Sequence, residues 1–255
     1  MRPNCFDTLH SIDFRAACPT APQNYQGPDK THNPTSITLH YEGPAIPEAG
    51  NVAKEKQRII NDAAYHINKV WGYDNNGKPL HGNGLEYHIN VLCDGSILWT
   101  RDLKDFLWHC ANYEGNGNSI AIHLPLGDGQ LPTTVQWQRT CDLFDALCAE
   151  YTLSKAKVYA HKEWPGAATA CPGLILFSKL QEYRFIPQPA WYVTVINITP
   201  PDHLNIRQGP STKYPIAGKL NAGDRVLVDA VKIEDQGEWL HLASGLGFIS
   251  KWYTQ

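Results

Sequence analysis

The stretch from residue 160 to residue 173 reads AHKEWPGAATACPG. It places His161 and Cys171 at the two ends of a short loop of mostly small residues, and the short strand expected at 157–160 delivers His161 to the loop. Imidazole nitrogen and thiolate sulfur are two of the ligands that zinc prefers in proteins. With one more protein ligand, this pair can hold a zinc ion and leave a coordination position for water, which the metal activates for hydrolysis.

A third ligand is available at His40, near the end of a stretch that alternates with period two and predicts a strand at 35–41. Strand ends are where an α/β sheet presents functional side chains, although a histidine on a strand can also be an ordinary residue. Three other interpretations stay open. The residues can form a copper site, for which the single methionine, Met1, is a poor axial ligand. Cys171 can be a nucleophile with His161 as its base, or simply a buried thiol.

The composition argues against several classes of protein. The 255 residues carry a formal net charge of −3, which provides no basic surface for nucleic acid. No apolar run reaches the roughly 18 residues that span a bilayer, so we expect no membrane segment. Residues 1–11 lack the apolar core of a secretory signal peptide, which predicts that the chain is not exported by that route.

Cysteine usage favours reduced thiols. The chain has seven cysteines, an odd number, and no signal peptide is expected. Buried thiols plus one functional thiol are therefore favoured over a disulfide framework. Cys141 and Cys148 are spaced about two helical turns apart, which suits small core side chains better than a bridge.

The first two thirds of the chain alternate strand and helix patterns, which predicts an α/β unit with a mixed central sheet flanked by helices. The strands are expected at 35–41, 87–92, 96–99, 119–124 and 157–160, and the helices at 51–70, 135–151 and 174–183. Residues 73–84 and 115–118 are rich in Gly, Asn and Asp and are expected to be loops. Residues 1–34 are rich in proline and polar residues and are expected to form an irregular arm.

The pattern changes after a proline-rich break, IPQPA at 186–190, which predicts a linker over residues 187–194. Residues 195–255 carry short alternating stretches separated by turns, with no helical period. This texture predicts a small all-β barrel or sandwich. Its strands are expected at 192–195, 204–207, 225–228, 239–242 and 247–249.

Several short motifs follow one another in a fixed order. They are LH at 39–40, LEYHI at 85–89, DG at 94–95, WHCA at 108–111, NSIAI at 118–122, and the stretch from His161 to CPG at 171–173. Together they resemble the type-2 N-acetylmuramoyl-L-alanine amidases, a family that includes phage lysozyme-type amidases and peptidoglycan recognition proteins. The resemblance covers roughly residues 34–183. It implies a zinc ion held by His40, His161 and Cys171, and a substrate amide between N-acetylmuramic acid and L-alanine of peptidoglycan.

The resemblance also implies roles for further residues. It makes Tyr87 the catalytic tyrosine and places Thr169 where the family carries Lys or Thr, and both hydroxyls are expected to donate to the oxyanion of the transition state. His123 stands where some members carry a glutamate, so we expect it to shuttle a proton unless it only lines the cleft. His109 and Trp164 are expected to contact substrate, with packing as the alternative for each.

A second resemblance covers roughly residues 195–253. It rests on LNIRQGPS at 204–211, Trp239 and GFI at 247–249. These features are similar to bacterial SH3-like modules, which commonly hold enzymes on cell-wall peptide; a barrel that only stabilises or dimerises the enzyme is the alternative. The chain is thus divided into a zinc amidase domain with its N-terminal arm at 1–186, a linker at 187–194 and an SH3-like cell-wall-binding domain at 195–255.

The leading hypothesis is therefore a zinc-dependent peptidoglycan amidase, an endolysin of a phage or prophage. We expect a monomer, made in the cytoplasm, that acts at the bacterial cell wall after release. Two other hypotheses are a Cys/His peptidase that cleaves the stem peptide and a protein that binds peptidoglycan without cleaving it. Chelation is expected to abolish the amidase and to spare the peptidase.

Overall fold

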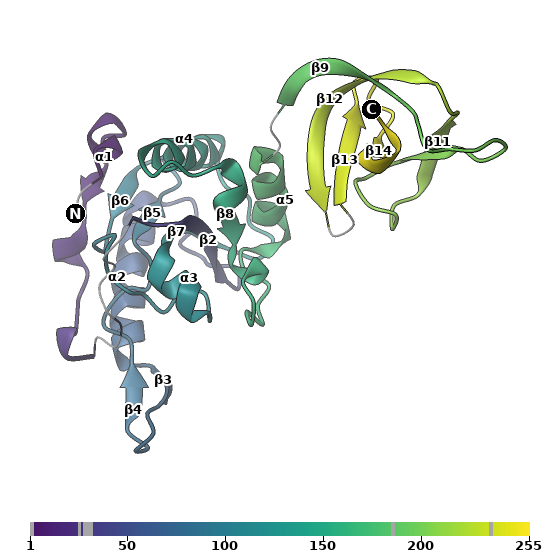
Figure 1. Cartoon of the computed structure of the whole chain (residues 1–255). Coiled ribbons are helices and arrows are strands. Elements are labelled where there is room, and N and C mark those ends of the chain that lie inside the picture. Colours follow the sequence, from purple (N-terminus) through teal and green to yellow (C-terminus); the bar gives the residue numbers. More distant parts are fainter. Residues whose placement is uncertain (1–2, 25–26, 28–32, 185–186, 235–236) are drawn as a thin grey trace. The chain divides into compact units, whose positions relative to one another are not determined.

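A computed structural model describes residues 3–24, 27, 33–184, 187–234 and 237–255 (Figure 1). The chain forms two compact units, Met1–Glu182 and Tyr183–Gln255, and each is described by itself. Ile186, at the start of the expected break, lies outside the described residues.

The first unit is built on one mixed sheet of six strands, in the order β1-β6-β5-β7-β2-β8. The strands are β1 (Ile12–Asp13), β2 (Ser36–Gly43), β5 (Ile89–Val91), β6 (Ile97–Trp99), β7 (Ser119–Gly127) and β8 (Val158–Ala160). All neighbouring strands are parallel except β5 and β6, which form an antiparallel pair. The prediction of a mixed central sheet is confirmed.

Helices surround this sheet (Figure 1). They are α1 (Cys5–Thr8), α2 (Val52–Asn68), α3 (Tyr113–Asn118), α4 (Thr134–Glu150) and α5 (Gly173–Arg184), with short 3₁₀ turns at Arg15–Ala17, Pro22–Asn24, Lys155–Lys157 and His161–Glu163. The N-cap residues Asn51 and Thr133 begin α2 and α4 by accepting main-chain N–H groups with their side chains. Ile59 and Ala63 of α2 are fully buried in a cluster that includes Leu98 of β6.

The register of the parallel strands determines where the functional side chains lie. Leu39 of β2 pairs with Ala160 of β8, and this is the last pair between the two strands. The next residue of each strand, His40 and His161, therefore lies at the same end of the sheet. On the other side of β2, His40 is in register with His123 of β7. Three histidines from distant parts of the sequence are thereby brought to one end of the sheet.

The N-terminal arm differs from its prediction. Residues 1–34 were expected to be irregular, but Phe6 is fully buried and its ring lies 5.6 Å from that of Trp99. β1 adds to the edge of the sheet beside β6. Arg15 places its guanidinium 3.4 Å from the centroid of the Trp99 ring. The arm is therefore an integral part of the first unit.

Two expected loops also contain regular structure. The loop predicted at 73–84 overlaps an antiparallel hairpin of β3 (Val70–Tyr73) and β4 (Pro79–His81), and the DNNG motif at 74–77 is its turn. The loop predicted at 115–118 belongs to α3. The side chain of Asn112 caps this helix by accepting the N–H of Gly115, which offsets the low helix propensity of its glycines.

The second unit is an all-β fold of six antiparallel strands, which confirms the predicted class. Its strands are β9 (Pro187–Thr194), β10 (Leu204–Arg207), β11 (Ile216–Leu220), β12 (Arg225–Glu234), β13 (Gly237–Leu242) and β14 (Phe248–Ser250), in the order β11-β10-β14-β13-β12-β9, followed by a 3₁₀ turn at Lys251–Tyr253. The prediction of a linker at 187–194 is wrong, because these residues form β9, which pairs with β12. Their side chains from Trp191 onward alternate toward a core that includes Val193 and Leu240.

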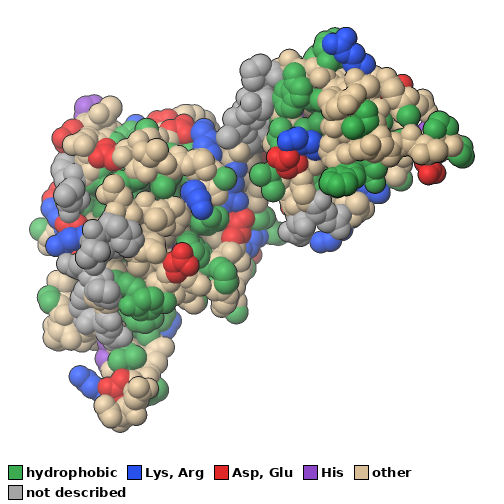
Figure 2. Space-filling model, viewed as in Figure 1, with side chains coloured by type: hydrophobic (Ala, Val, Ile, Leu, Met, Phe, Trp, Pro, Cys, Tyr) green, Lys and Arg blue, Asp and Glu red, His purple; other side chains and the backbone are tan. Residues whose placement is uncertain are grey.

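The described residues also show how charges are distributed on one face and in which state the cysteines are. On the face in Figure 2, Lys and Arg side chains are interspersed with Asp and Glu. Within the described ranges, no helix has the length and apolar character needed to cross a membrane. All seven cysteines are thiols rather than disulfides, as predicted.

Candidate metal centre and cavity

The structure brings together the three residues proposed as zinc ligands. The ligand atoms offered by His40, His161 and Cys171 all lie within 4.8 Å of one another. His40 comes from β2 and His161 from the turn directly after β8, as the strand register requires. The loop returns Cys171 to this place because the N–H of Lys162 donates to the carbonyl oxygen of Cys171 at 2.9 Å.

A glycine after the last ligand makes this return possible. Gly173 has a φ of +78°, and its N–H donates to the carbonyl oxygen of Ala170 at 2.8 Å. A Cβ at this position would lie 2.8 Å from the ring of Tyr41. Gly173 therefore meets two requirements, a left-handed backbone and a close approach to β2, that other residues do not meet.

The donor atoms of this centre fit a zinc ion. His40 Nε2 lies 3.0 Å from His109 Nδ1, which leaves His40 Nδ1, 3.7 Å from Cys171 Sγ, for a metal. His161 Nε2 is buried and has no hydrogen-bond partner among the described residues. Two imidazole nitrogens and one sulfur, with one position left open, form a typical donor set of catalytic zinc sites.

Burial sets the protonation of these three side chains. It lowers the pKa of His40 well below its usual value and that of His161 to about 4, so both rings are neutral and able to bind a metal. Burial raises the pKa of Cys171 to about 12. A thiolate in this place therefore needs a bound cation, which is the behaviour of a metal ligand that exchanges its proton for the metal.

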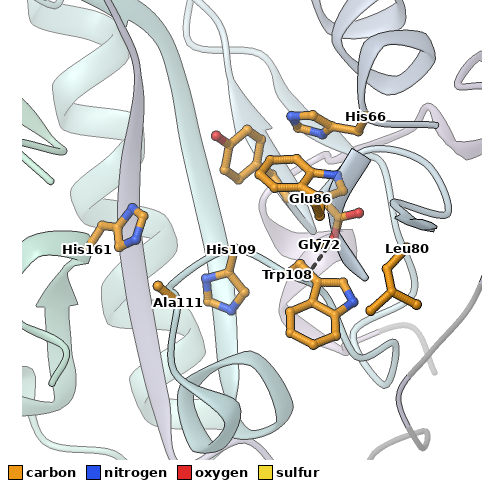
Figure 3. A pocket seen from close by; sticks show the side chains of 10 residues that line it. His66, Gly72, Leu80, Glu86, Trp108, His109, Ala111 and His161 are labelled. Atoms are coloured by element: carbon orange, nitrogen blue, oxygen red, sulfur yellow. Dashed lines mark hydrogen bonds between the residues drawn. The ribbon is translucent and has the colours of Figure 1, made fainter. Parts of the chain in front are cut away.

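A cavity of about 360 Å³ adjoins the metal centre. Its lining residues are His66, Trp71, Gly72, Leu80, Glu86, Tyr87, Trp108, His109, Ala111 and His161. Figure 3 shows His161 at one end and Glu86, Trp108 and Leu80 at the other, with His109 between them. The cavity thus extends from His161, one of the three candidate ligands, to Leu80 of the β3–β4 hairpin.

Tyr87 lines the cavity beside the ligands. Its ring centroid lies 5.1 Å from that of His40. Burial raises the pKa of Tyr87 well above its usual value, and negative charge on Cys171 raises it further. The hydroxyl therefore keeps its proton and can act as a hydrogen-bond donor.

His123 lies beneath Tyr87 and does not line the cavity. The two rings are stacked, with centroids 4.3 Å apart and an angle of 4° between their planes. His123 is 1% exposed, and its Nδ1 lies 2.8 Å from Asn90 Oδ1. Burial lowers the pKa of His123 to about 3, so the ring is neutral. The structure therefore gives His123 a position that supports the Tyr87 ring, and it does not support the predicted proton shuttle.

The other three predicted site residues lie in different surroundings. His109 is buried against His40 and also lines the cavity, so it contacts a proposed ligand as well as the substrate space. Thr169 is exposed, and its hydroxyl accepts the N–H of Cys171 at 3.1 Å. Trp164 lines a separate cavity and donates its indole N–H to Thr38 Oγ1 at 2.9 Å. The prediction that Trp164 contacts substrate is therefore not supported by its position in the fold.

Sequence reasoning missed Glu86 and Trp71, and it gave His66 no function. All three line the cavity. Glu86 is 2% exposed, and its position between Leu85 and Tyr87 was a usable signal, because a carboxylate within an otherwise apolar stretch is rarely buried without a reason. Trp71 had no such signal, since it lies between the helix expected at 51–70 and the loop expected at 73–84.

Comparisons with known proteins agree with this arrangement. A family model described as N-acetylmuramoyl-L-alanine amidase matches residues 30–174, and one described as bacterial SH3 domain matches residues 202–255. No curated protein matches the sequence. Peptidoglycan recognition protein-LE, solved in complex with tracheal cytotoxin, has a similar fold, with a TM-score of 0.52 and 20% identity over 68% of this chain and 92% of that one.

Two further solved structures are more distant. The endolysin amidase LysCS from Clostridium intestinale URNW has a TM-score of 0.43 and 18% identity over 68% of this chain and 91% of that one. Drosophila PGRP-LB has a TM-score of 0.46 and 19% identity over 60% of this chain and 83% of that one. The amidase family model alone matches more than half of the residues. The chain belongs to the N-acetylmuramoyl-L-alanine amidase family, and a bacterial SH3 domain follows the amidase domain.

Proposed function

We propose that this protein is a zinc-dependent hydrolase that cleaves the amide bond between N-acetylmuramic acid and L-alanine of peptidoglycan. The observation that carries the proposal is the group of His40, His161 and Cys171, with His40 and Cys171 buried and His161 half-buried, at one end of a cavity that Tyr87 also lines. Membership of the amidase family supports the same reaction. A binding protein without activity would have no use for a buried thiol at this position.

The side chains around the centre have separate tasks in this reaction. Zinc, when bound, supplies Lewis acidity that polarises the amide carbonyl and lowers the pKa of water. Tyr87 keeps its proton and donates a hydrogen bond to the negative charge that develops on the carbonyl oxygen. The Thr169 hydroxyl accepts from the Cys171 N–H and retains its own hydrogen for a second donation to that charge. His109 fixes the orientation of the His40 ring through Nε2.

The burial of Cys171 argues against the peptidase hypothesis. Cys171 is 6% exposed, and a nucleophilic thiolate needs an accessible site that stabilises its charge. The Sγ atom instead faces His40 Nδ1 at 3.7 Å, with His161 also within reach. These contacts suit a ligand better than an attacking group.

We further propose that the second unit holds the enzyme on the bacterial cell wall, and that the enzyme acts there as an endolysin of phage or prophage origin, made in the cytoplasm and released. The bacterial SH3 match supports the first part. Attachment to an insoluble polymer raises the local concentration of the substrate without a change in the catalytic centre. Peptidoglycan is then the partner of both units, and we propose that a monomer is sufficient.

The proposal is tested by digestion of purified sacculi, with mass spectrometry of the released ends and metal analysis of the same protein. We expect newly formed free amino groups on L-alanine, newly formed free carboxyl groups on the lactyl moiety and one zinc ion per chain. Chelation should stop cleavage, whereas thiol alkylation in saturating zinc should not. Cleavage within the stem peptide would identify a peptidase, and binding without new ends would identify a recognition protein; either result would contradict the proposal.

A further inference from the structure

We propose that Trp164 is a positioning residue for the metal centre. It ties the loop that carries His161 and Cys171 to the strand that carries His40, so that the three ligands are held together before a metal binds. This inference rests on the zinc centre of the proposed function, and it gives Trp164 a role other than the substrate contact expected from the sequence. The ligand loop is defined here as residues 161–171.

The ligand loop has few side chains that can hold it in place. Residues 165–170 read PGAATA, and all of them except Ala167 are exposed. The hydrogen bond from the N–H of Lys162 to the carbonyl oxygen of Cys171 joins the two ends of the loop to each other. The Lys162 ammonium lies 3.5 Å from the ring centroid of Phe177 on α5, which follows the loop in the chain. Because small exposed side chains bury little apolar surface, the position of the loop depends on the contacts of its larger residues.

The Trp164 side chain makes such contacts with two elements of the first unit. Its ring centroid lies 5.2 Å from that of Tyr159 on β8, with an angle of 68° between the ring planes. The main chain of α3 is so close that a Cβ at Gly115 would lie 3.0 Å from the indole ring. Asn112, the N-cap of α3, donates from Nδ2 to the carbonyl oxygen of Pro165 at 3.1 Å. The sheet and α3 therefore both hold this part of the loop.

A hydrogen bond connects the same side chain to the strand of the third ligand. Trp164 Nε1, which can only donate, donates to Thr38 Oγ1 at 2.9 Å. Thr38 is fully buried and lies two residues before His40 on β2, so both side chains are on the same face of the sheet. Thr38 Oγ1 also lies 2.6 Å from Ser119 Oγ on β7, which fixes the position of the acceptor. The strand that supplies one ligand and the loop that supplies the other two are thereby joined.

This connection should strengthen metal binding. A metal binds more tightly where its ligands are already in place, because binding then requires no ordering of the loop. Without the hydrogen bond between Trp164 and Thr38, we expect the loop to open in part of the molecules. His161 and Cys171 would then leave His40. Residues that orient metal ligands typically change metal affinity by about 10- to 100-fold.

The first measurement is the zinc affinity of the full chain, determined by competition with a chelator of known affinity. Trp164→Phe keeps an aromatic ring and removes the N–H, and Thr38→Val keeps the shape of the side chain and removes the acceptor. We expect each substitution to weaken zinc binding about tenfold. Because both remove the same hydrogen bond, the double variant should bind zinc as well as either single variant.

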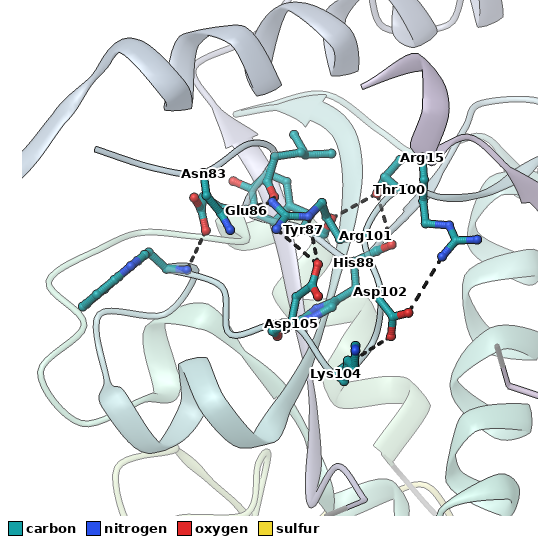
Figure 4. Close-up of polar contacts among 12 residues, drawn as sticks. Arg15, Asn83, Glu86, Tyr87, His88, Thr100, Arg101, Asp102, Lys104 and Asp105 are labelled. Carbon is teal, nitrogen blue, oxygen red and sulfur yellow. Dashed lines mark hydrogen bonds and ion pairs between the residues drawn. The ribbon is translucent and has the colours of Figure 1, made fainter. Parts of the chain in front are cut away.

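Two controls separate positioning from a general loss of stability. Trp137→Phe changes another half-buried tryptophan of the first unit, on α4. Asn83→Ala removes the acceptor of a buried hydrogen bond from Arg101, 3.0 Å long, in the group of contacts that also includes Asp105 (Figure 4). We expect both variants to keep the wild-type zinc affinity, including where thermal unfolding shows a loss of stability.

The second measurement uses the zinc-free full chain and does not depend on the metal. The N–H of Lys162 donates to the carbonyl oxygen of Cys171, so its hydrogen exchange reports whether the loop is closed. We expect slow exchange in the wild type and exchange about tenfold faster in Trp164→Phe. The main-chain N–H groups inside α4 should exchange at the same rate in both proteins.

Several results would overturn the inference. One is wild-type zinc affinity in Trp164→Phe, and another is an equal loss of affinity in Trp137→Phe or Asn83→Ala. Losses that add in the double variant would show that the two side chains act separately. Rapid exchange of the Lys162 N–H in the zinc-free wild type would show that the metal, and not the tryptophan, orders the loop.

The outcomes also separate this inference from the proposed function. If the wild type bound no zinc, the proposed function would be contradicted, and the exchange rates would still decide whether Trp164 holds the loop. If zinc bound with the expected effects of the variants but sacculi were not cleaved, only the proposed function would be contradicted. Thr38→Val, measured in the same two ways, decides the inference if Trp164→Phe does not fold.

Discussion

The two units of the chain bury different kinds of side chain. In the first unit the sheet and its surroundings enclose many polar and charged residues, namely Ser36, Thr38, His40, Glu55, His66, Asn83, Glu86, His88, Asn90, Thr100, Arg101, His109, Asn116, Ser119, His123, Gln136 and Thr140. In the second unit, the core of the described residues is a set of aliphatic side chains, namely Val193, Val195, Leu204, Ile206, Val228, Leu240, Leu242 and Ile249.

This difference shows where buried polar groups lower the stability of the fold. Burial of a polar group costs free energy unless the group is hydrogen-bonded, and burial of a charge costs more. In the first unit, several buried polar groups lack hydrogen-bond partners, among them His161 Nε2 and Glu86 Oε1, and both residues line the cavity. In the second unit, the one such atom among the described residues is Trp239 Nε1. Substitutions in the two units should therefore have different consequences.

The largest effect is expected from loss of a zinc ligand. Cys171→Ala and His40→Ala should each abolish hydrolysis and zinc binding together, because a site with two protein ligands does not retain the metal. Activity and metal content are measured on the same preparation. Cys141→Ala, which removes a half-buried thiol on α4, is the control and should keep both. Normal zinc content in Cys171→Ala would show that the ligand assignment is wrong.

The second largest effect, a reduced turnover rate, is expected from Tyr87→Phe. The variant should bind zinc normally and slow turnover by about 10²-fold, the effect of one lost donor to the oxyanion. The His123 ring should still stack on the new side chain, so the fold is retained. Tyr65→Phe, on an exposed part of α2, is the matched control. A wild-type rate in Tyr87→Phe would remove the hydroxyl from the mechanism.

A moderate effect is expected at His109. In His109→Phe the hydrogen bond to His40 Nε2 is lost, so the His40 ring is no longer held in one orientation. We expect zinc affinity to fall about tenfold, the lower end of the range for residues that orient a metal ligand. Competition with a chelator of known affinity measures this change. His10→Gln, at an exposed position, should leave the affinity unchanged, and an unchanged affinity in His109→Phe would leave His109 with a role in substrate contact only.

The smallest effect on the rate of cleavage is expected from removal of the second unit. A chain shortened by deletion of 187–255 should cleave a soluble muramoyl peptide at the wild-type rate, because the ligands, Tyr87 and the cavity all belong to the first unit. It should sediment less with purified cell walls, since the local concentration on the polymer is lost. Unchanged sedimentation would reduce the second unit to a structural role and weaken the contrast between the two units.

The sequence was sufficient to predict the parts of the fold that have strong periodicity. The strand at 35–41, the helix at 135–151 and the strand that delivers His161 were all found, because their hydrophobic patterns extend over whole elements. The metal centre followed from motifs whose residue types have specific chemistry. The order of these motifs was enough to place His40, His161 and Cys171 in one group.

The errors arose where tertiary contacts override local signals. The stretch 187–194 contains two prolines and looks like a linker, yet it pairs with β12 as an edge strand, where proline is tolerated. The segment 115–118 is rich in glycine, yet the Asn112 cap and the contacts of the Asn116 side chain with main-chain N–H groups of His109 and Cys110 keep it helical. Neither kind of contact is visible in a sequence pattern.

Two of the expected site residues, His123 and Trp164, lie away from the cavity that adjoins His161 for a related reason. The resemblance suggested a proton shuttle or a cleft-lining residue at His123, and substrate contact or packing at Trp164, but the direction of a side chain depends on what packs around it. Tyr87 covers His123, and Thr38 accepts the indole N–H of Trp164. Glu86 was missed because only coordinates show that its buried side chain lies beside the cavity.

The central claim, a zinc ion held by two imidazoles and one sulfur, is tested most directly by X-ray absorption at the zinc edge of the loaded protein. We predict one sulfur at about 2.3 Å and two imidazole nitrogens at about 2.0–2.1 Å in the wild type, with one further light ligand. In Cys171→Ala the sulfur shell should be absent. A wild-type spectrum without sulfur, or with more than one sulfur, would contradict the account.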